Sequence, residues 1–269
     1  MMDSLAGTSR RNFLQLATTG AALGLAAPSR LMAREQAAYP SSVGSKFYPD
    51  GRVHPFAGNT IICHLPQQGD HANAFNAMMD VYRDAPTHRF LRKVAVLPPS
   101  SYHMTVFDGA NDHSRKPDSW PSDLPSNMPI EACNRALADR LRNFDLGIKL
   151  PIRMRVDPEQ SPTNGRAMIF RLQPYDIAEN VKLRGLRDRI ADVLRYRAPD
   201  HDKYQFHMSF GYPVAWLDAE EDRDFQQTWR RWAGEIAGKC PEILLGAPEY
   251  CIYDDMFAFH RQFYLGQNG

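Results

Sequence analysis

Two short segments of the sequence carry a histidine followed, two residues later, by a hydroxyl side chain. They are Tyr102-His103-Met104-Thr105-Val106-Phe107 and, about one hundred residues later, Phe206-His207-Met208-Ser209-Phe210-Gly211. An imidazole with an ordinary pKa of about 6.5 can act as a base or as an acid close to neutral pH. A hydroxyl can hydrogen-bond a non-bridging oxygen of a phosphate group. The pattern therefore predicts acid–base catalysis at a phosphate ester, with His103 and His207 as catalytic residues and Thr105 and Ser209 as phosphate-binding residues.

Both segments alternate in the manner of β-strands, in which successive side chains point to opposite faces of a sheet. His103 and Thr105 therefore share one face of their strand, and His207 and Ser209 share one face of theirs. The residues between them are apolar or aromatic, which fits a core packed under helices. If the two strands meet about a pseudo-twofold axis, the four polar groups converge on one cleft. This scheme requires neither a metal ion nor another cofactor.

The elements around the two segments follow the same order in each half of the chain. We predict strand, helix, strand, helix and strand over residues 59–65, 70–82, 101–107, 129–144 and 149–156, with a long surface loop at 108–128. The second half repeats this order over residues 166–172, 176–197, 205–211, 218–238 and 242–253, and a last strand at 257–265 pairs with the preceding one. Asp218 is expected to cap the last helix.

This repetition indicates a structural duplication. We predict an α+β fold in which residues 58–269 form one bilobal domain. Its lobes, at about 58–156 and 165–269, are each a small antiparallel-rich sheet covered by outer helices, and the active cleft lies between them.

The two segments also resemble the motifs of a known superfamily. His103-Met104-Thr105-Val106 and His207-Met208-Ser209-Phe210 are similar to the paired His-x-Thr/Ser motifs of the 2H phosphoesterases. Together with Phe56-Ala57-Gly58-Asn59-Thr60-Ile61-Ile62-Cys63-His64-Leu65, they look like three landmark stretches of a poorly characterised bacterial branch of that superfamily. The resemblance runs from about Lys46 to the end of the chain. It implies a bilobal α+β fold and cyclic-phosphodiesterase or RNA-ligase-like chemistry, and it supplies no substrate for this branch.

A phosphate also requires cations or hydroxyl donors nearby. The candidates in the sequence are Arg92, Arg166, Arg171, Tyr102, Tyr204 and Tyr212. Strand parity turns Tyr102 away from the cleft, whereas Tyr212, just beyond the second segment, is placed to reach it. Tyr212 and Arg166 are therefore candidate substrate contacts.

Two alternatives to a metal-independent phosphodiesterase stay open. One is a protein of the same fold that binds a nucleotide or another phosphate ester without turnover. The other is a metal-dependent hydrolase, in which His64, His103 and His207 would hold the metal. No carboxylate spacing supports such a metal site, and we expect His64 to be a packing residue.

The composition is that of an ordinary globular protein, with 43% hydrophobic residues and a net charge of +1 from 32 basic and 31 acidic residues. Proteins that bind long nucleic acid by bulk charge are usually strongly basic. We therefore expect a small-molecule phosphodiester as the partner of this site. The cysteines have no zinc-site spacing and are expected to be buried thiols; they are Cys63, Cys133, Cys240 and Cys251.

The first residues of the chain have the features of an export signal. Ser9-Arg10-Arg11-Asn12-Phe13-Leu14-Gln15 precedes an apolar, small-residue run from Leu16 to Ala27, which resembles a twin-arginine signal. The run is too short and too rich in Ala and Gly for a good membrane span. We expect a signal peptide at 1–35, a linker at 36–57, delivery by the twin-arginine machinery and a periplasmic location. Such a location argues against an intracellular RNA substrate.

Overall fold

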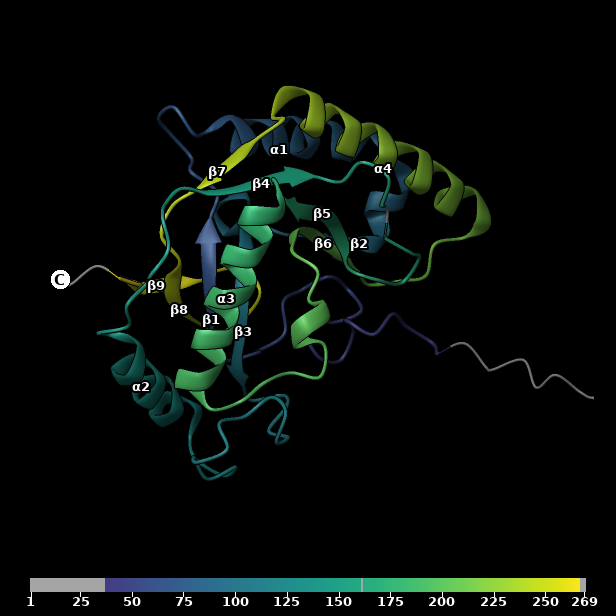
Figure 1. Ribbon diagram of the computed structural model, residues 1–269. Coiled ribbons are helices and arrows are strands. Elements are labelled where there is room, and N and C mark those ends of the chain that lie inside the picture. The colour runs from purple at the N-terminus through teal and green to yellow at the C-terminus, as the bar shows by residue number, and fades with distance from the viewer. Residues whose placement is uncertain (1–36, 161, 267–269) are drawn as a thin grey trace, which may run out of the picture. The chain divides into compact units, whose positions relative to one another are not determined.

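The structure is a computed structural model that describes residues 37–160 and 162–266 (Figure 1). The elements of this part of the chain are β1 (Gly58–His64), α1 (Asn73–Asp84), η1 (Ala85–Thr87), η2 (Arg89–Lys93), β2 (Val94–Val96), η3 (Pro99–Ser101), β3 (His103–Asn111), α2 (Ile130–Leu141), β4 (Ile152–Val156), β5 (Met168–Pro174), α3 (Ile177–Leu194), η4 (His201–Lys203), β6 (His207–Pro213), α4 (Ala219–Lys239), β7 (Ile243–Leu245), β8 (Glu249–Tyr253) and β9 (His260–Tyr264). The predicted α+β class is confirmed. The short strand β2 and the 3-10 turns, η1 to η4, were not expected from the sequence.

All the pairings between named strands are antiparallel, and together they join nine strands into one sheet. The order is β7-β4-β5-β6-β3-β1-β8-β9, and β2 pairs with β6 beside this path. The two halves of the sequence exchange strands, because β4 pairs with β5 and β7 while β8 and β9 lie beyond β1. The boundaries 58–156 and 165–269 therefore describe the repeat in the sequence and not the grouping of strands in space.

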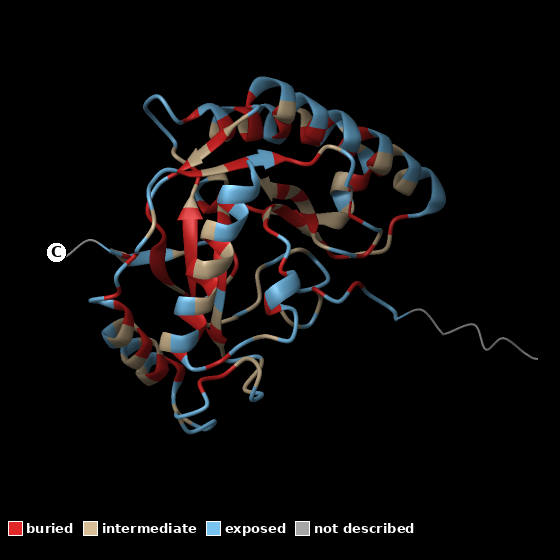
Figure 2. Cartoon of the chain, viewed as in Figure 1, coloured by how far each residue is buried: buried red, intermediate tan, exposed pale blue. Residues whose placement is uncertain are grey.

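Helices pack on the sheet and bury its apolar side. Helices α1 and α4 contact each other, and α3 contacts β3, β5 and α2 (Figure 1). Figure 2 shows the buried residues concentrated in the strands and on the inner sides of these helices. Helix α4 begins where expected: the Asp218 carboxylate accepts hydrogen bonds from two backbone N–H groups of the first turn, and Glu221 completes a capping box.

The segment of residues 40–56, which the sequence presents as a linker, packs against the domain. The side chain of Phe47 is 0% exposed and lies against the rings of Tyr212 and Phe257. The Ser42 hydroxyl donates a hydrogen bond to the carbonyl oxygen of Pro213, at the end of β6. The segment has no periodic pattern of apolar residues, because a loop that packs through one aromatic ring needs none.

All four cysteines are buried and free, as expected. No helix in the described ranges has the length and apolar character needed to cross a membrane. The expected signal peptide lies outside the described residues.

Candidate active site

Strands β3 and β6 bring the two histidine segments side by side. Met104 pairs with Met208 in antiparallel register, which sets His103 opposite Ser209 and Thr105 opposite His207. The methionines are fully buried, whereas the two histidines and the two hydroxyl residues are half-buried on the other face. A pseudo-twofold axis therefore passes through the Met104–Met208 pair, and each half contributes one imidazole and one hydroxyl to the same surface.

These four side chains line one cavity of 270 Å³. Its remaining walls come from β1, the outer part of β3, the segment 46–56 and the turn before β9. The other lining residues are Lys46, Phe56, Thr60, Asp108, Gly109, Asn111, Tyr212, Tyr253, Met256 and Phe259. The cavity combines a polar floor with aromatic walls, which is the usual character of a small-molecule site.

Both motif histidines are held in the same way. The Nδ1 atom of His103 lies 2.6 Å from the carbonyl oxygen of Ser101, and that of His207 lies 3.0 Å from the carbonyl oxygen of Gln205. Each carbonyl can only accept a hydrogen bond, so Nδ1 carries the proton and Nε2 is the free basic atom of the neutral ring. Within the described chain, neither Nε2 atom has a hydrogen-bond partner. This tautomer presents two proton acceptors that a substrate can reach.

The surroundings of the two imidazoles differ. Burial lowers the pKa of His103 to about 3, and its ring lies edge-on to Phe259 at a centroid distance of 4.5 Å. Burial also lowers the pKa of His207, but the Gln205 carbonyl and the Asp108 carboxylate oppose this shift. Burial in turn raises the pKa of the Asp108 carboxyl group, whereas the nearby imidazole of His207 lowers it. A carboxylate thus favours the protonated form of His207, whereas none is among the groups that shift the pKa of His103.

Lys46 is a site residue that sequence reasoning missed. Its Nζ atom lies 3.3 Å from the hydroxyl of Tyr212 and 4.7 Å from the centre of that ring. It also lies 5.5 Å from the centre of the Phe56 ring. Tyr212, a candidate contact in the sequence, therefore lines the cavity and holds the lysine there. One sequence feature could have indicated Lys46: the resemblance to the 2H phosphoesterases begins at about this residue.

The other candidate residues are placed differently. Arg166 and Arg171 line a cavity that adjoins the first one and shares Lys46, His207 and Tyr212 with it. Tyr102 is buried away from the cavity, as strand parity predicts, and Tyr204 is buried with its ring under the guanidinium of Arg187.

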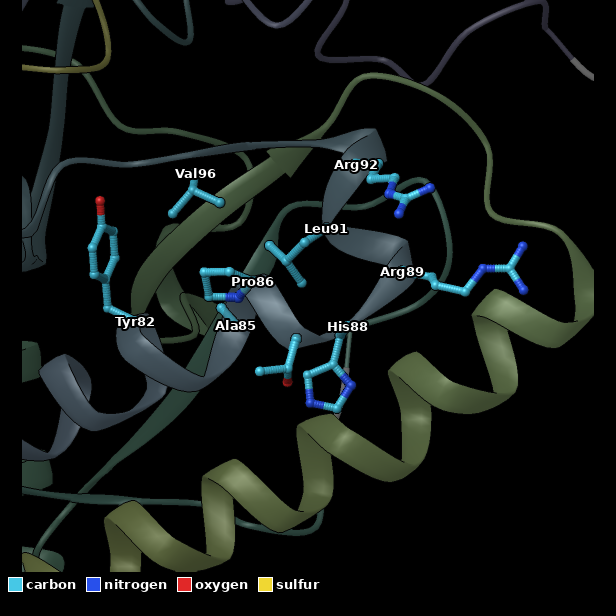
Figure 3. A pocket seen from close by; sticks show the side chains of 9 residues that line it. Tyr82, Ala85, Pro86, His88, Arg89, Leu91, Arg92 and Val96 are labelled. Atoms are coloured by element: carbon cyan, nitrogen blue, oxygen red, sulfur yellow. The ribbon is translucent and has the colours of Figure 1, made fainter.

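Arg92 is remote from both histidine segments. Together with Tyr82, His88 and Leu91, it lines a separate, largely apolar cavity of 390 Å³ (Figure 3). None of the lining residues of this cavity belongs to β3 or β6. The structure therefore gives no support to Arg92 as a phosphate contact.

His64 has a polar partner, so packing alone does not describe it. Its Nδ1 atom lies 2.9 Å from Oε2 of Glu249, and its ring centre is 6.0 Å from that of His103. His64, Glu249 and Cys251 offer three donor atoms within 4.8 Å of one another. Two features disfavour a metal there: Nη1 of Arg261 lies 3.5 Å from the same carboxylate oxygen, and burial raises the pKa of the Cys251 thiol.

Residues 46–164 match the family model described as "2H-phosphodiest: Domain of unknown function (DUF1868)". This match includes the first histidine segment and ends before the second. Over these residues, the chain is similar to a family that is named for 2H phosphodiesterases and described as a domain of unknown function. A search of curated proteins gave no significant match.

This chain is also similar to solved structures. A conserved protein of unknown function from Agrobacterium tumefaciens is 28% identical, with a TM-score of 0.75, over 85% of this chain and 94% of that one. A protein described as a phosphoesterase is 13% identical over 80% of this chain and 100% of that one, with a TM-score of 0.42. A Thermus thermophilus protein is 14% identical over 79% and 98% of the two chains, with a TM-score of 0.38. The first of these similarities supports the mixed α+β fold.

Proposed function

We propose that this protein is a metal-independent phosphodiesterase that opens or hydrolyses a cyclic or otherwise activated phosphodiester. The observation that carries the proposal is the paired geometry of His103 and His207. Both rings are locked by a carbonyl at Nδ1, both present a free Nε2 to one cavity, and each lies beside the hydroxyl residue of the opposite motif.

The reaction needs one base and one acid, and the two imidazoles supply them. The Nε2 atom of one histidine accepts a proton from water as the water oxygen attacks phosphorus. The bond from phosphorus to the alkoxide breaks, and the other histidine, in its protonated form, gives its Nε2 proton to that alkoxide. Thr105 and Ser209 bind the non-bridging oxygens, and Lys46 neutralises part of their charge. Acid–base catalysis of this kind contributes roughly 10² to 10⁴ in rate.

The aromatic walls favour a substrate with a flat, apolar portion. Phe56, Tyr253 and Phe259 line the same cavity as the histidines, and aromatic side chains stack well on nucleobases. A nucleotide-derived phosphodiester therefore fits this cavity better than a purely aliphatic one.

A turnover assay with variants of both histidines tests this proposal. The protein is incubated, with chelator present, with 2′,3′-cyclic nucleotides, ADP-ribose cyclic phosphate and short 2′–5′ oligonucleotides. We expect turnover of at least one substrate and a loss of about 10² to 10⁴ in kcat for His103→Ala and for His207→Ala. His113→Ala is the matched control, because His113 is an exposed histidine outside both motifs.

The alternatives give different results in the same assay. Full activity in both histidine variants would eliminate the proposed pair. Activity that chelator abolishes would favour the metal-dependent hydrolase. Saturable ligand binding without product after long incubation would favour the binding protein.

A further inference from the structure

A second cavity, which we call the basic cavity, adjoins the cavity of the two histidines. It has a volume of 560 Å³ and shares Lys46, His207 and Tyr212 with its neighbour. Three serines of the segment 41–46, the loop at 162–167 and the cleft face of β5 form its other walls. A substrate bound at His207 would therefore have room to extend into it.

The charges that line the basic cavity are all positive. Lys46, Arg166 and Arg171 contribute to its wall, and the described lining contains no aspartate or glutamate. None of these three residues forms an ion pair with another residue of the described ranges. A concave surface lined by three cations and by no carboxylate of the described ranges attracts anions.

Arg171 lies beside the catalytic histidine. It is the direct cross-strand partner of His207, and one of its Nη atoms lies 3.3 Å from the Gln205 carbonyl oxygen that also accepts from His207. Its Nε atom is buried and has no hydrogen-bond partner among the described residues. Burial lowers the pKa of Arg171, yet a guanidinium stays protonated at neutral pH, so Arg171 remains a cation. The Nη2 atom of Arg171, which donates to no other residue of the described ranges, can bind an anion in the basic cavity.

A comparison of the two sides of the pseudo-twofold axis shows that an arginine lies beside only one of the two motif histidines. His64 is the direct cross-strand partner of His103, so it occupies the position that Arg171 occupies beside His207. The backbone hydrogen bonds follow the same symmetry. The N–H of Leu65 donates to the carbonyl oxygen of Tyr102, and the N–H of Leu172 donates to the carbonyl oxygen of Phe206. On the His103 side, however, the residue at this position is His64, and its imidazole is hydrogen-bonded to the carboxylate of Glu249. Only the His207 side offers uncompensated positive charge.

We propose that the basic cavity is a second phosphate subsite, which binds a phosphomonoester of the substrate other than the phosphodiester that reacts. The inference rests on the proposed function for the identity of the reacting group. Guanidinium groups bind phosphate oxygens in a bidentate manner, so Arg166 and Arg171 contact the second phosphate. Lys46, which lines both cavities, lies between the two phosphates.

This arrangement defines the substrate class. Neighbouring strands are about 4.8 Å apart, so Arg171 lies one strand beyond His207 and the two phosphates are separated by a short spacer such as one sugar ring. A nucleoside 2′,3′-cyclic phosphate that also carries a 5′-phosphate has these features. The asymmetry between Arg171 and His64 fixes one orientation of such a substrate.

Calorimetric binding of two product-like nucleotides tests the subsite without requiring turnover. Adenosine 2′-monophosphate carries one phosphate, and adenosine 2′,5′-bisphosphate carries the second. Charge-assisted hydrogen bonds favour the bisphosphate by about tenfold to a hundredfold in the wild type. The R166M/R171M double variant should lose most of this preference, because Lys46 is the one cation of the three that remains. R230M is the matched control, because Arg230 is exposed on α4 and lines neither cavity.

The outcomes separate this proposal from the proposed activity. A wild type that does not bind the bisphosphate more tightly, or a preference that is undiminished in the double variant, overturns the subsite. A preference lost in the double variant, in a protein without turnover of any substrate, supports the subsite and removes the catalytic proposal. The exposed Arg166 can be replaced alone without disturbing the core, so R166M, which should lose part of the preference, provides the test if the double variant does not fold.

Discussion

The two motif histidines have the same backbone partners and different electrostatic neighbours. A carboxylate, Asp108, lines their cavity and favours the protonated form of His207. His103 lies between the Phe259 ring and the imidazole of His64, and its pKa is lowered to about 3. We therefore expect His103 to be the base and His207 to be the acid when a cyclic phosphodiester is opened, with the roles exchanged in the reverse direction.

Replacement of Asp108 by asparagine tests this difference through the pH dependence of the rate. The carboxylate raises the pKa of His207, so its removal lowers that pKa, and less of the acid is protonated at neutral pH. The alkaline limb of kcat/KM should therefore move to lower pH. Asp112→Asn, on the exposed Asp112 nearby, should leave the profile unchanged. An alkaline limb that does not move in Asp108→Asn contradicts the role given to Asp108.

At the scale of elements, the site depends on how closely strands and loops approach β6. Gly211 of β6 pairs with Val96 of β2. A Cβ atom there would lie 2.8 Å from Cγ1 of Val94 and 2.9 Å from the carbonyl oxygen of Ala95, so glycine permits β2 to pair at this point. The segment 40–56 is held against the end of the same strand and brings Lys46 to the cavity.

The packing of Phe47 should therefore affect both stability and substrate binding. Phe47→Ala removes a fully buried ring, and such truncations cost about 3–5 kcal/mol in free energy of unfolding. Because Lys46 is the preceding residue, KM should also rise in this variant. Denaturant unfolding and steady-state kinetics measure the two effects. Tyr48→Ala is the control, since Tyr48 is 37% exposed. If both variants are equally stable, the segment does not contribute to the fold in the way described.

At the scale of the whole molecule, the exchange of strands makes the two halves interdependent. Strand β4 completes the sheet of the second half, and β8 and β9 extend the sheet of the first. The join between the two motif strands is the single Met104–Met208 pair. The relative position of the two histidines is therefore set by the strands and helices of the entire domain, and not by the local hydrogen bonds of β3 and β6 alone.

Export through the twin-arginine machinery is a proposal about the whole chain, and it rests on the sequence of residues 9–27. We propose that the mature protein acts in the periplasm. Replacing both Arg10 and Arg11 by lysine should retain the precursor in the cytoplasm, because the paired arginines are the feature that this route recognises. Cell fractionation with detection of the protein measures the distribution, and Arg30→Lys is the control. Unchanged periplasmic delivery of the double variant would remove the proposal.

The sequence by itself determined the α+β class, most of the helices and strands, and the four side chains on one face of two strands. Those features follow from local rules: the period-two alternation around His103 and His207, the helical spacing of apolar residues, and the capping residue Asp218. A repeat about one hundred residues long also pointed to a shared cleft.

Only the tertiary structure decided which distant residues complete the site. Lys46 reaches the cavity because Phe47 packs on Tyr212, and Arg171 rather than His64 offers an uncompensated charge because Glu249 lies on the other side. The strand exchange that places β8 beside β1 has no local signal. These features depend on contacts between residues far apart in the chain, and such contacts are selected by packing and charge compensation in three dimensions, which no short window of sequence contains.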